Sequence, residues 1–263
     1  MRKFLWKPDP PKAKDWDASP KLRVRGPLPT KVLLRHLILS VLDQANLGSC
    51  VANAIFQAVR AALVRAGVVG AQLGSRLWGY YFGRAQTGNT QADEGTYLRA
   101  VFDVIRKLGY PLEALWPYDD GPDKFRQMPS SAAVRAAYDQ KTSVGYYRIN
   151  SSDQQRVEDV KAALAAGYLV VFGTQVSNLF EAYAASSPPL TVPGKSEVIL
   201  GGHALTIVGY EVLPDGATIF EVLNSWGDFY GDHGYCKFTS EYVAWSESQD
   251  FWIVEAMPDF SEK

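Results

Sequence analysis

Apolar residues recur at helical spacing in the first half of the chain and form compact strand-like runs in the second half. The clearest helix is expected over 50–66, because its apolar face repeats about every 3.6 residues: Ile55, Val59, Ala62, Leu63 and Ala66. Further helices are expected at 75–83, 95–108 and 153–166. Runs of β-branched and aromatic residues predict strands at 144–149, 168–172, 203–212, 218–223 and 234–238. Helices therefore dominate the first half and strands the second, with a long loop expected at 182–200.

The first 30 residues differ in composition from the rest of the chain. They contain six prolines, which favour extended structure. In residues 1–35, ten Lys and Arg against three Asp give a charge of +7, and the remaining 17 basic and 25 acidic residues carry −8. We therefore expect a basic, Pro-rich arm at 1–30 before an acidic body. Two interpretations stay open: a surface segment packed along the body, or a segment that covers a cleft in it.

The bulk composition excludes several classes of protein. The net charge of −1 gives no sign of nucleic-acid binding. No apolar run approaches the roughly 18–20 residues of a membrane span, and the apolar N-terminus is interrupted at Lys7 and Pro8, which argues against a secretory signal. Only two cysteines are present, Cys50 and Cys236, so a reducing, cytoplasmic location is the simpler interpretation. A single disulfide between the two stays an alternative.

Cys50 lies where a polar, turn-prone stretch passes into the first expected helix. Unpaired backbone N–H groups and the positive end of the helix dipole favour a thiolate there, and such positions can lower the pKa of a thiol from about 8.5 to about 3.5–7.5. Gln44 can direct its amide N–H to the same point as the backbone N–H of Cys50, and two such donors stabilise the oxyanion of acyl transfer. Gly48 and Gly95 would let a substrate backbone approach closely.

Three histidines are candidates for the base that such a thiol needs. His36 lies in an apolar lead-in and His233 in a glycine-rich turn, where core or surface roles are the simpler interpretation. His203 follows two glycines and begins a strand-like run, where it can face a cleft. Asn224 ends the next expected strand. If the two strands pair as neighbours, Asn224 can accept a hydrogen bond from the ring of His203 and fix its orientation. Trp226 can shield that hydrogen bond from water.

Three motifs occur in the order cysteine, histidine, asparagine: Gln44–Cys50; Gly202-His203-Ala204 with Val208-Gly209-Tyr210; and Asn224-Ser-Trp-Gly-x-x-x-Gly-x-x-Gly-Tyr235. Together they resemble the papain-like cysteine peptidases over about residues 30–256. The intervals from the cysteine to the histidine (203 − 50 = 153) and to the asparagine (224 − 50 = 174) slightly exceed the range of about 130–150 known for the family. The sequence therefore resembles a prokaryotic or phage-type member without the long prodomain.

The resemblance implies a two-lobed papain-like fold of the α+β class. The arm would occupy 1–30 and the peptidase domain 31–263. Within that domain we expect a helical lobe at about 43–140 and an antiparallel β-barrel-like lobe at about 141–263, with the active-site cleft between them.

The resemblance also implies a role for each motif residue. Cys50 would be the nucleophile, His203 the general base and acid, Asn224 the orienting residue and Gln44 the oxyanion donor. The substrate-binding positions would be Gly48, Gly95, Gly202, Trp226 and Tyr230. Only Gly95 matches the glycine pair that binds substrate backbone in the family, and Tyr230 replaces a tryptophan. Leu47 and Val51 replace a disulfide-forming cysteine and an aromatic residue.

We therefore expect a cysteine peptidase that hydrolyses peptide bonds through an acyl-thioester on Cys50. We expect no metal and no cofactor, and a monomer whose partner is a peptide or protein substrate. Two alternatives stay open: a transamidase or acyltransferase with the same residues, and a non-catalytic binding module with the same fold. We interpret Cys236 as a buried structural cysteine. The basic arm would restrict the cleft in place of a prodomain.

Overall fold

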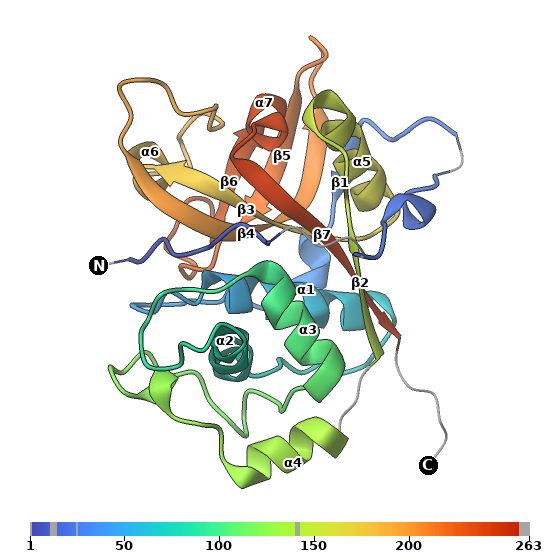
Figure 1. The fold of residues 1–263 in the computed structure, drawn as a ribbon. Helices are drawn as coiled ribbons and strands as arrows, with labels where there is room; N and C mark the ends of the chain where they lie inside the picture. Colours follow the sequence, from blue (N-terminus) through green and yellow to red (C-terminus); the bar gives the residue numbers. More distant parts are fainter. Residues whose placement is uncertain (1, 11–14, 25, 140–142, 258–263) are drawn as a thin grey trace.

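A helical region and a seven-stranded antiparallel sheet lie against each other in the computed structural model, which describes residues 2–10, 15–24, 26–139 and 143–257 (Figure 1). The helices are α1 (Cys50–Arg65), α2 (Arg76–Ala85), α3 (Leu98–Leu108), α4 (Ser131–Asp139), α5 (Asp153–Ala165), α6 (Asn178–Glu181) and α7 (Ser240–Ala244). Short 3₁₀ turns are η1 (Ser19–Lys21), η2 (Arg35–Leu37) and η3 (Lys124–Arg126). The strands are β1 (Lys31–Leu33), β2 (Ser143–Arg148), β3 (Val170–Ser177), β4 (Ile199–Val212), β5 (Thr218–Leu223), β6 (Tyr235–Thr239) and β7 (Ser248–Met257).

Helix α1 is buried from Cys50 to Leu63 apart from Arg60. It packs against β4 and β7 on one side and against α2 and α3 on the other. Its many alanines keep the helix slim, so that these neighbours can approach it closely. The first residue of the helix, Cys50, is thereby held at a fixed place opposite β4.

The sheet has the strand order β2-β7-β3-β4-β5-β6, and β1 pairs with β4. Every pairing of these strands is antiparallel. The α+β, two-lobed fold expected from the sequence is confirmed. Among the described strands, β2 and β6 lie at the two edges of the sheet and do not pair with each other. The sheet is therefore open, and it matches the expected barrel-like lobe only loosely.

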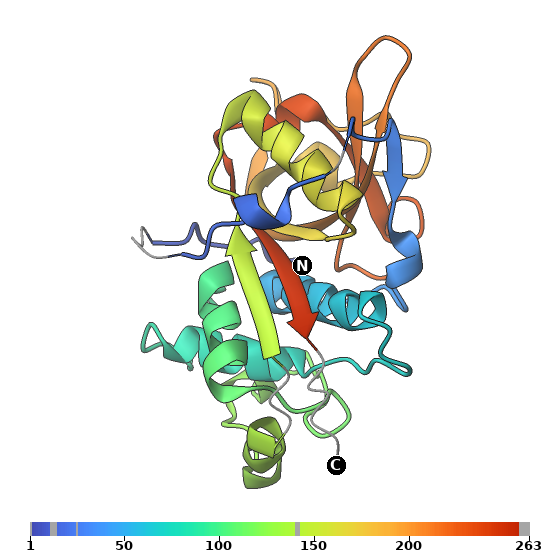
Figure 2. The same ribbon diagram turned by 90° about the vertical axis from the view of Figure 1, so that its right-hand side faces the viewer.

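Strands β2 and β7 connect the two regions, and Figure 2 shows them running side by side past the helices. Their residues Val144, Tyr146, Val254 and Ala256 belong to the same buried cluster as residues of α1 and α3. A second cluster fills the space between the sheet and helices α5 and α7. The helical region is therefore packed onto the long β2–β7 pair, which lies within the range expected for the β lobe.

The expected elements are confirmed as α1, α2, α3, α5, β2, β3, β4, β5 and β6, with shifts of a few residues at their ends. Helix α3 begins at Leu98 instead of 95, because Gly95 has a φ of +72° and Tyr97 is extended. Strand β7 and helices α4, α6 and α7 were not predicted, and neither was the short β1. No helix in the described ranges is both long enough and apolar enough to cross a membrane.

Candidate active site

The thiol of Cys50 lies at the first residue of α1 and is fully buried. Burial raises its pKa to about 11, although backbone hydrogen bonds from Ala204, Val51 and Leu5 act in the opposite direction. The contact with Ala204 places the thiol against β4, at the residue that follows His203. The contact with Leu5 comes from the N-terminal arm. The lowered pKa expected from the helix start is therefore absent in this state, because no water reaches the sulfur.

His203, inside β4, and Asn224, directly after the end of the neighbouring β5, form a buried pair. His203 Nε2 lies 2.8 Å from Asn224 Oδ1, and the backbone N–H of Ser225 donates to the same oxygen at 2.8 Å. Because an amide oxygen only accepts, Nε2 donates and the neutral ring keeps its lone pair on Nδ1. Nδ1 has no hydrogen-bond partner among the described residues. Burial, together with the charge of Arg2, lowers the pKa of His203 to about 4, although the hydrogen bond to Asn224 acts in the opposite direction.

Aromatic rings enclose the imidazole of His203. Its ring centroid lies 5.2 Å from Trp226, 5.5 Å from Phe180 and 5.9 Å from Phe4. Tyr230 packs against Trp226 at 4.9 Å and donates its hydroxyl to the carbonyl of Phe180 at 2.9 Å. Trp226 therefore covers the imidazole, while Tyr230 lies behind it and supports both aromatic rings.

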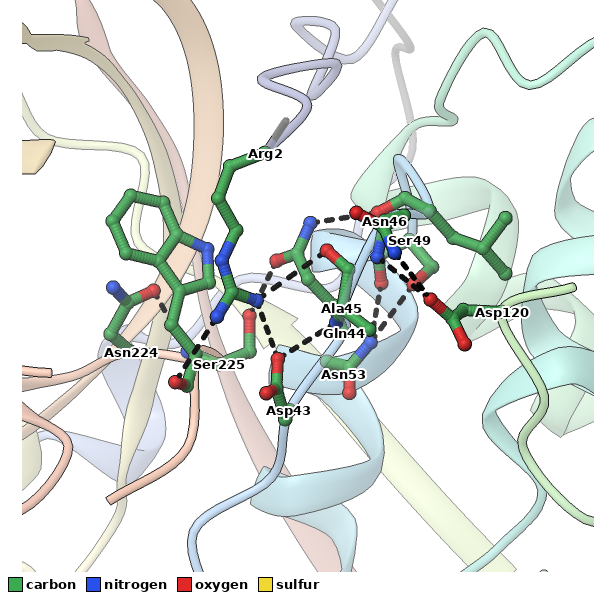
Figure 3. Close-up of polar contacts among 12 residues, drawn as sticks. Arg2, Asp43, Gln44, Ala45, Asn46, Ser49, Asn53, Asp120, Asn224 and Ser225 are labelled. Atoms are coloured by element: carbon green, nitrogen blue, oxygen red, sulfur yellow. Dashed lines mark hydrogen bonds and ion pairs between the residues drawn. The ribbon is translucent and has the colours of Figure 1, made fainter. Parts of the chain in front are cut away.

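Gln44 is held by hydrogen bonds at both ends of its side-chain amide (Figure 3). Its Oε1 accepts from the hydroxyl of Ser225 at 2.7 Å, and its Nε2 donates to the carbonyl of Leu47 at 2.9 Å. Its backbone N–H also donates to the carbonyl of Ser225 at 2.8 Å. The second N–H of the amide faces the carbonyl oxygen of Lys3 at 3.5 Å. A carbonyl oxygen of the arm therefore lies beside the Gln44 amide, the group that the sequence predicts to be an oxyanion donor.

Residues 2–9, called here the leading segment, lie between the sheet and the helical region (Figure 1). On the sheet side Leu5 forms a parallel bridge with Gly202, and the N–H of Trp6 donates to the carbonyl of Gly202 at 2.9 Å. On the helical side the carbonyl of Leu5 would lie 1.7 Å from a Cβ at Gly95. The side chain of Leu5 would lie 2.5 Å from a Cβ at Gly48. The expected substrate-binding glycines therefore contact the protein's own chain.

Ion pairs hold the first residues of the leading segment. Arg2 pairs with Asp43 at 2.5 Å (Figure 3). Its guanidinium also lies over the ring of Trp226. Lys3 pairs with Asp93 at 2.5 Å. The carboxylate of Asp93 also accepts the backbone N–H of Gly48 at 3.0 Å. Basic residues of the arm therefore meet acidic residues of the body beside the candidate nucleophile.

A buried charge cluster holds the other end of the segment. The backbone N–H of Asp9 donates to Asp250 at 2.6 Å, and its carboxylate accepts the backbone N–H of Arg99 at 2.9 Å. Arg99 also binds Asp15 at 2.5 Å, and Arg148 binds Asp250 at 2.6 Å. Burial and the neighbouring Asp250 raise the pKa of Asp9 to about 7. Three carboxylates and two guanidiniums thus anchor the arm to the body.

Other residues singled out in the sequence lie away from this site. Cys236 is buried in β6, and burial raises the pKa of its thiol strongly. Both cysteines are free. His36 and His233 are exposed. In the described part of the chain, no group of three or more His, Cys, Asp or Glu side chains is arranged to hold a metal ion.

The sequence did not predict the contacts of two further residues around the site, Ser225 and Asp93. Ser225 holds both Gln44 and Asn224, and it lies inside the quoted asparagine motif. Asp93 binds Gly48, Lys3 and the hydroxyl of Tyr80. Asn224 is the neighbour of Ser225, and Tyr80 lies near Asp93 in the sequence. The other partners of Ser225 and Asp93 are 45 to 181 positions away, so no local pattern could predict these contacts.

The geometry agrees with comparisons to known proteins. A family model described as papain family cysteine protease matches residues 28–253. The chain belongs to the papain family. The peptidase C1-like protein L477 of Acanthamoeba polyphaga mimivirus is 34% identical over 235 residues, which cover 87% of this chain and 74% of the viral protein. This papain-family chain is therefore a cysteine peptidase.

Solved structures of the papain family share the architecture. Xylellain, a cysteine protease from Xylella fastidiosa, superimposes with a TM-score of 0.83 at 30% identity, covering 98% of both chains. Bromelain from Ananas comosus, solved with the inhibitor E64, has a TM-score of 0.64 at 18% identity, covering 88% of this chain and all of bromelain. The latter likeness concerns the fold alone.

Proposed function

We propose that this cysteine peptidase is latent, with Cys50, His203, Asn224 and Gln44 as its catalytic set and the leading segment as its own inhibitor. One observation carries the proposal: the leading segment contacts both walls of the site. Its Leu5 lies at the Cys50 thiol, and a carbonyl of the same segment faces the Gln44 amide. A substrate cannot enter while the segment is in place.

The proposed reaction begins when the Cys50 thiol transfers its proton to Nδ1 of His203. The thiolate attacks the peptide carbonyl and forms a C–S bond, while Gln44 and the backbone N–H of Cys50 stabilise the oxyanion. His203 then protonates the leaving amine as the C–N bond breaks, which leaves a thioester. Water, deprotonated by His203, attacks the thioester, and the C–S bond breaks to release the acid. Asn224 keeps Nε2 protonated and Nδ1 aimed at the reacting atoms.

The direction of the leading segment supports inhibition over cleavage. The leaving amine must lie near His203, and residues 2–4 contact that side through Trp226 and His203. Residues 6 and 7 lie on the opposite, acyl side, against Gly202 and Thr96. A substrate runs from its acyl side to its leaving side in the N-to-C direction. The segment runs the other way, so its peptide bonds present the wrong polarity for attack.

The electrostatics support the same conclusion. With the segment in place the thiol has a pKa of about 11 and the imidazole a pKa of about 4, so both are neutral at pH 7. Burial is the first cause of both shifts. Displacing the segment admits water, which moves both pKa values back towards the range in which a thiolate–imidazolium pair forms.

The test compares the hydrolysis of a fluorogenic peptide library by three proteins: the full chain, a chain that lacks residues 1–9, and the full chain with Cys50→Ala. Residues 15–24 are kept because Ala18 bonds to Arg148 on β2. We expect kcat/KM to rise at least about tenfold on deletion and to vanish with Cys50→Ala. An unchanged kcat/KM after deletion would refute the inhibitory role of the leading segment. Activity in Cys50→Ala would show that Cys50 is not the nucleophile.

Other expectations from the sequence stay predictions. They are the cytoplasmic location, the monomeric state and the absence of a nucleic-acid partner. Both cysteines are free, which agrees with a reducing compartment. Adding an amine acceptor to the same assay separates hydrolysis from acyl transfer, because a transferase would give the amide product.

A further inference from the structure

The carboxylate of Asp93 is enclosed beside Gly48, two residues before Cys50. Its side chain is only 6% exposed. The backbone N–H of Gly48 donates to its Oδ1 at 3.0 Å, and the hydroxyl of Tyr80 donates to the same oxygen. Burial and the charge of Asp93 raise the pKa of Tyr80 well above its ordinary value, so that the hydroxyl keeps the proton that it donates. Two neutral donors therefore hold the carboxylate in a fixed place near the candidate nucleophile.

The leading segment supplies the cation that pairs with this carboxylate. Lys3 Nζ lies 2.5 Å from Oδ2 of Asp93, which otherwise meets only the Gly48 N–H, at 3.3 Å. The side chain of Lys3 is 45% exposed, so the ion pair lies at the solvent edge of the site. The nearby Arg84 lies over the ring of Tyr80 and donates to backbone carbonyls instead. Among the described residues, Asp93 therefore loses its paired cation when the leading segment leaves.

This carboxylate faces the place of the substrate residue nearest the thiol. Leu5 reaches the Cys50 thiol through its backbone N–H and lies between the leaving side and the acyl side. A Cβ at Gly48 would lie 2.5 Å from the side chain of Leu5 and 3.2 Å from Oδ1 of Asp93. A substrate residue that replaces Leu5 would be the first residue on the N-terminal side of the scissile bond. Its side chain would therefore pass Gly48 and reach Asp93.

We propose that Asp93 selects substrates with a lysine or arginine at the first residue N-terminal to the scissile bond. This inference rests on the proposed function, since it concerns the site that the leading segment leaves on activation. A long basic side chain at that residue restores the ion pair that Lys3 makes with Asp93, whereas a neutral side chain leaves Oδ2 without a cation. A glutamate is rejected because it meets a like charge. The glycine pair that the resemblance implies for this wall carries no charge, so the selectivity belongs to this chain.

The kinetic test uses the full chain with Trp6→Ala, in which loss of the buried indole weakens docking of the leading segment. Blocked fluorogenic peptides differ only at the first residue N-terminal to the scissile bond, which carries Lys, Arg, norleucine or Glu. Norleucine has the apolar stem of lysine without its charge. A hydrogen bond between charged groups predicts a kcat/KM for the Lys peptide about 10- to 100-fold above that of the norleucine peptide. Residual docking lowers both rates equally and cancels in their ratio.

Three added substitutions assign the preference to Asp93. Asp93→Asn keeps the shape of the side chain without its charge, and it should reduce the ratio to less than about threefold. Asp93→Glu keeps the charge and should retain a preference for the Lys peptide. Glu94→Gln is the matched control, since this exposed neighbour binds Asn89 and should keep the full ratio. A ratio near one in the Trp6→Ala protein, or a ratio that survives Asp93→Asn, would overturn the assignment.

A binding test removes the dependence on catalysis. The full chain with Cys50→Ala and Trp6→Ala is titrated with the Lys and norleucine peptides, and melting curves verify that every variant folds. We expect the Lys peptide to bind at least about tenfold more tightly, and Asp93→Asn to abolish the difference. Equal affinities of the two peptides would overturn the role of Asp93. Tighter Lys binding without hydrolysis of any peptide by the Trp6→Ala protein would instead overturn the proposed function and leave the selectivity standing.

Discussion

The buried carboxyl pair of Asp9 and Asp250 makes docking of the leading segment depend on pH. Asp9 lies on the segment, and Asp250, Asp15, Arg99 and Arg148 surround it. Burial and the charge of Asp250 raise the pKa of Asp9 from its ordinary 3.8 to about 7, despite the two guanidiniums. The docked carboxyl therefore keeps a proton over a range of pH in which an exposed aspartate has lost it.

This difference between the pKa values of the docked and the exposed Asp9 carboxyl sets the direction and the size of the pH effect on docking. Between about pH 4 and 7 the docked segment binds more protons than the displaced one through Asp9, so docking weakens as the pH rises. The interval from 3.8 to about 7 corresponds to about 4 kcal/mol at 1.36 kcal/mol per pH unit. This is an upper bound, because the proton is shared with Asp250. His203 has the opposite effect, since docking lowers its pKa to about 4 and so strengthens docking as the pH rises towards 6.5.

The assay separates the two titrations. Cys50→Ala and His203→Ala are introduced into the full chain to remove the opposing group, and the exchange of the Trp6 amide hydrogen is followed. After correction for intrinsic exchange, its protection should fall at least tenfold from pH 4.5 to 7.5. Adding Asp9→Asn should remove this slope, whereas Asp17→Asn, at an exposed aspartate of the same arm, should keep it. A slope that persists in Asp9→Asn, or is absent in the parent, would refute the reasoning.

Three further predictions concern single contacts. Ser225→Ala leaves the buried Oε1 of Gln44 without its hydrogen-bond donor, which costs about 1–3 kcal/mol. We therefore expect kcat to fall about 10- to 100-fold with little change in KM. Unaltered kinetics would show that the position of Gln44 does not depend on Ser225. Lys3→Ala breaks a half-exposed ion pair with Asp93, so steady-state hydrolysis should rise no more than about fivefold, and a much larger rise would make this pair the main restraint. Cys236→Ala should lower the Tm by about 2–4 °C and leave epoxide labelling of Cys50 unchanged, whereas loss of that labelling would link the two thiols.

The proposed catalytic set can be named from the sequence because it consists of rare residues in short local motifs. Cys50 stands at a helix start, and only three histidines compete for the role of base. The structure brings His203 in β4 and Asn224 just after β5 to hydrogen-bond distance, as the pairing of these two strands suggests. These features depend on local pattern and on one strand pairing, both of which the sequence carries.

The rest depends on contacts between distant segments. Strand β7 is buried on both faces from Phe251 to Val254, so it shows no alternation. The cluster around Asp9 joins residues from the arm, α3, β2 and β7, and no local sequence pattern predicts that these segments contact one another. Trp6 of the leading segment packs where Gly173 and Gly202 carry no side chain, and missing side chains leave no hydrophobic signal in the sequence. The charge difference between arm and body indicated contact, but not where the arm lies.

The most direct test of latency is the rate at which a thiol-directed epoxide labels Cys50 in the full chain. The label is located by mass spectrometry and its second-order rate constant is compared with that of the Trp6→Ala protein. Removing a buried tryptophan side chain costs about 3–5 kcal/mol of packing, which weakens docking of the segment. We predict slow labelling of the intact chain, at least about tenfold faster labelling in Trp6→Ala, and modification at Cys50 alone in both. Equal rates in the two proteins, or modification at Cys236 instead, would contradict a Cys50 nucleophile masked by its own N-terminal segment.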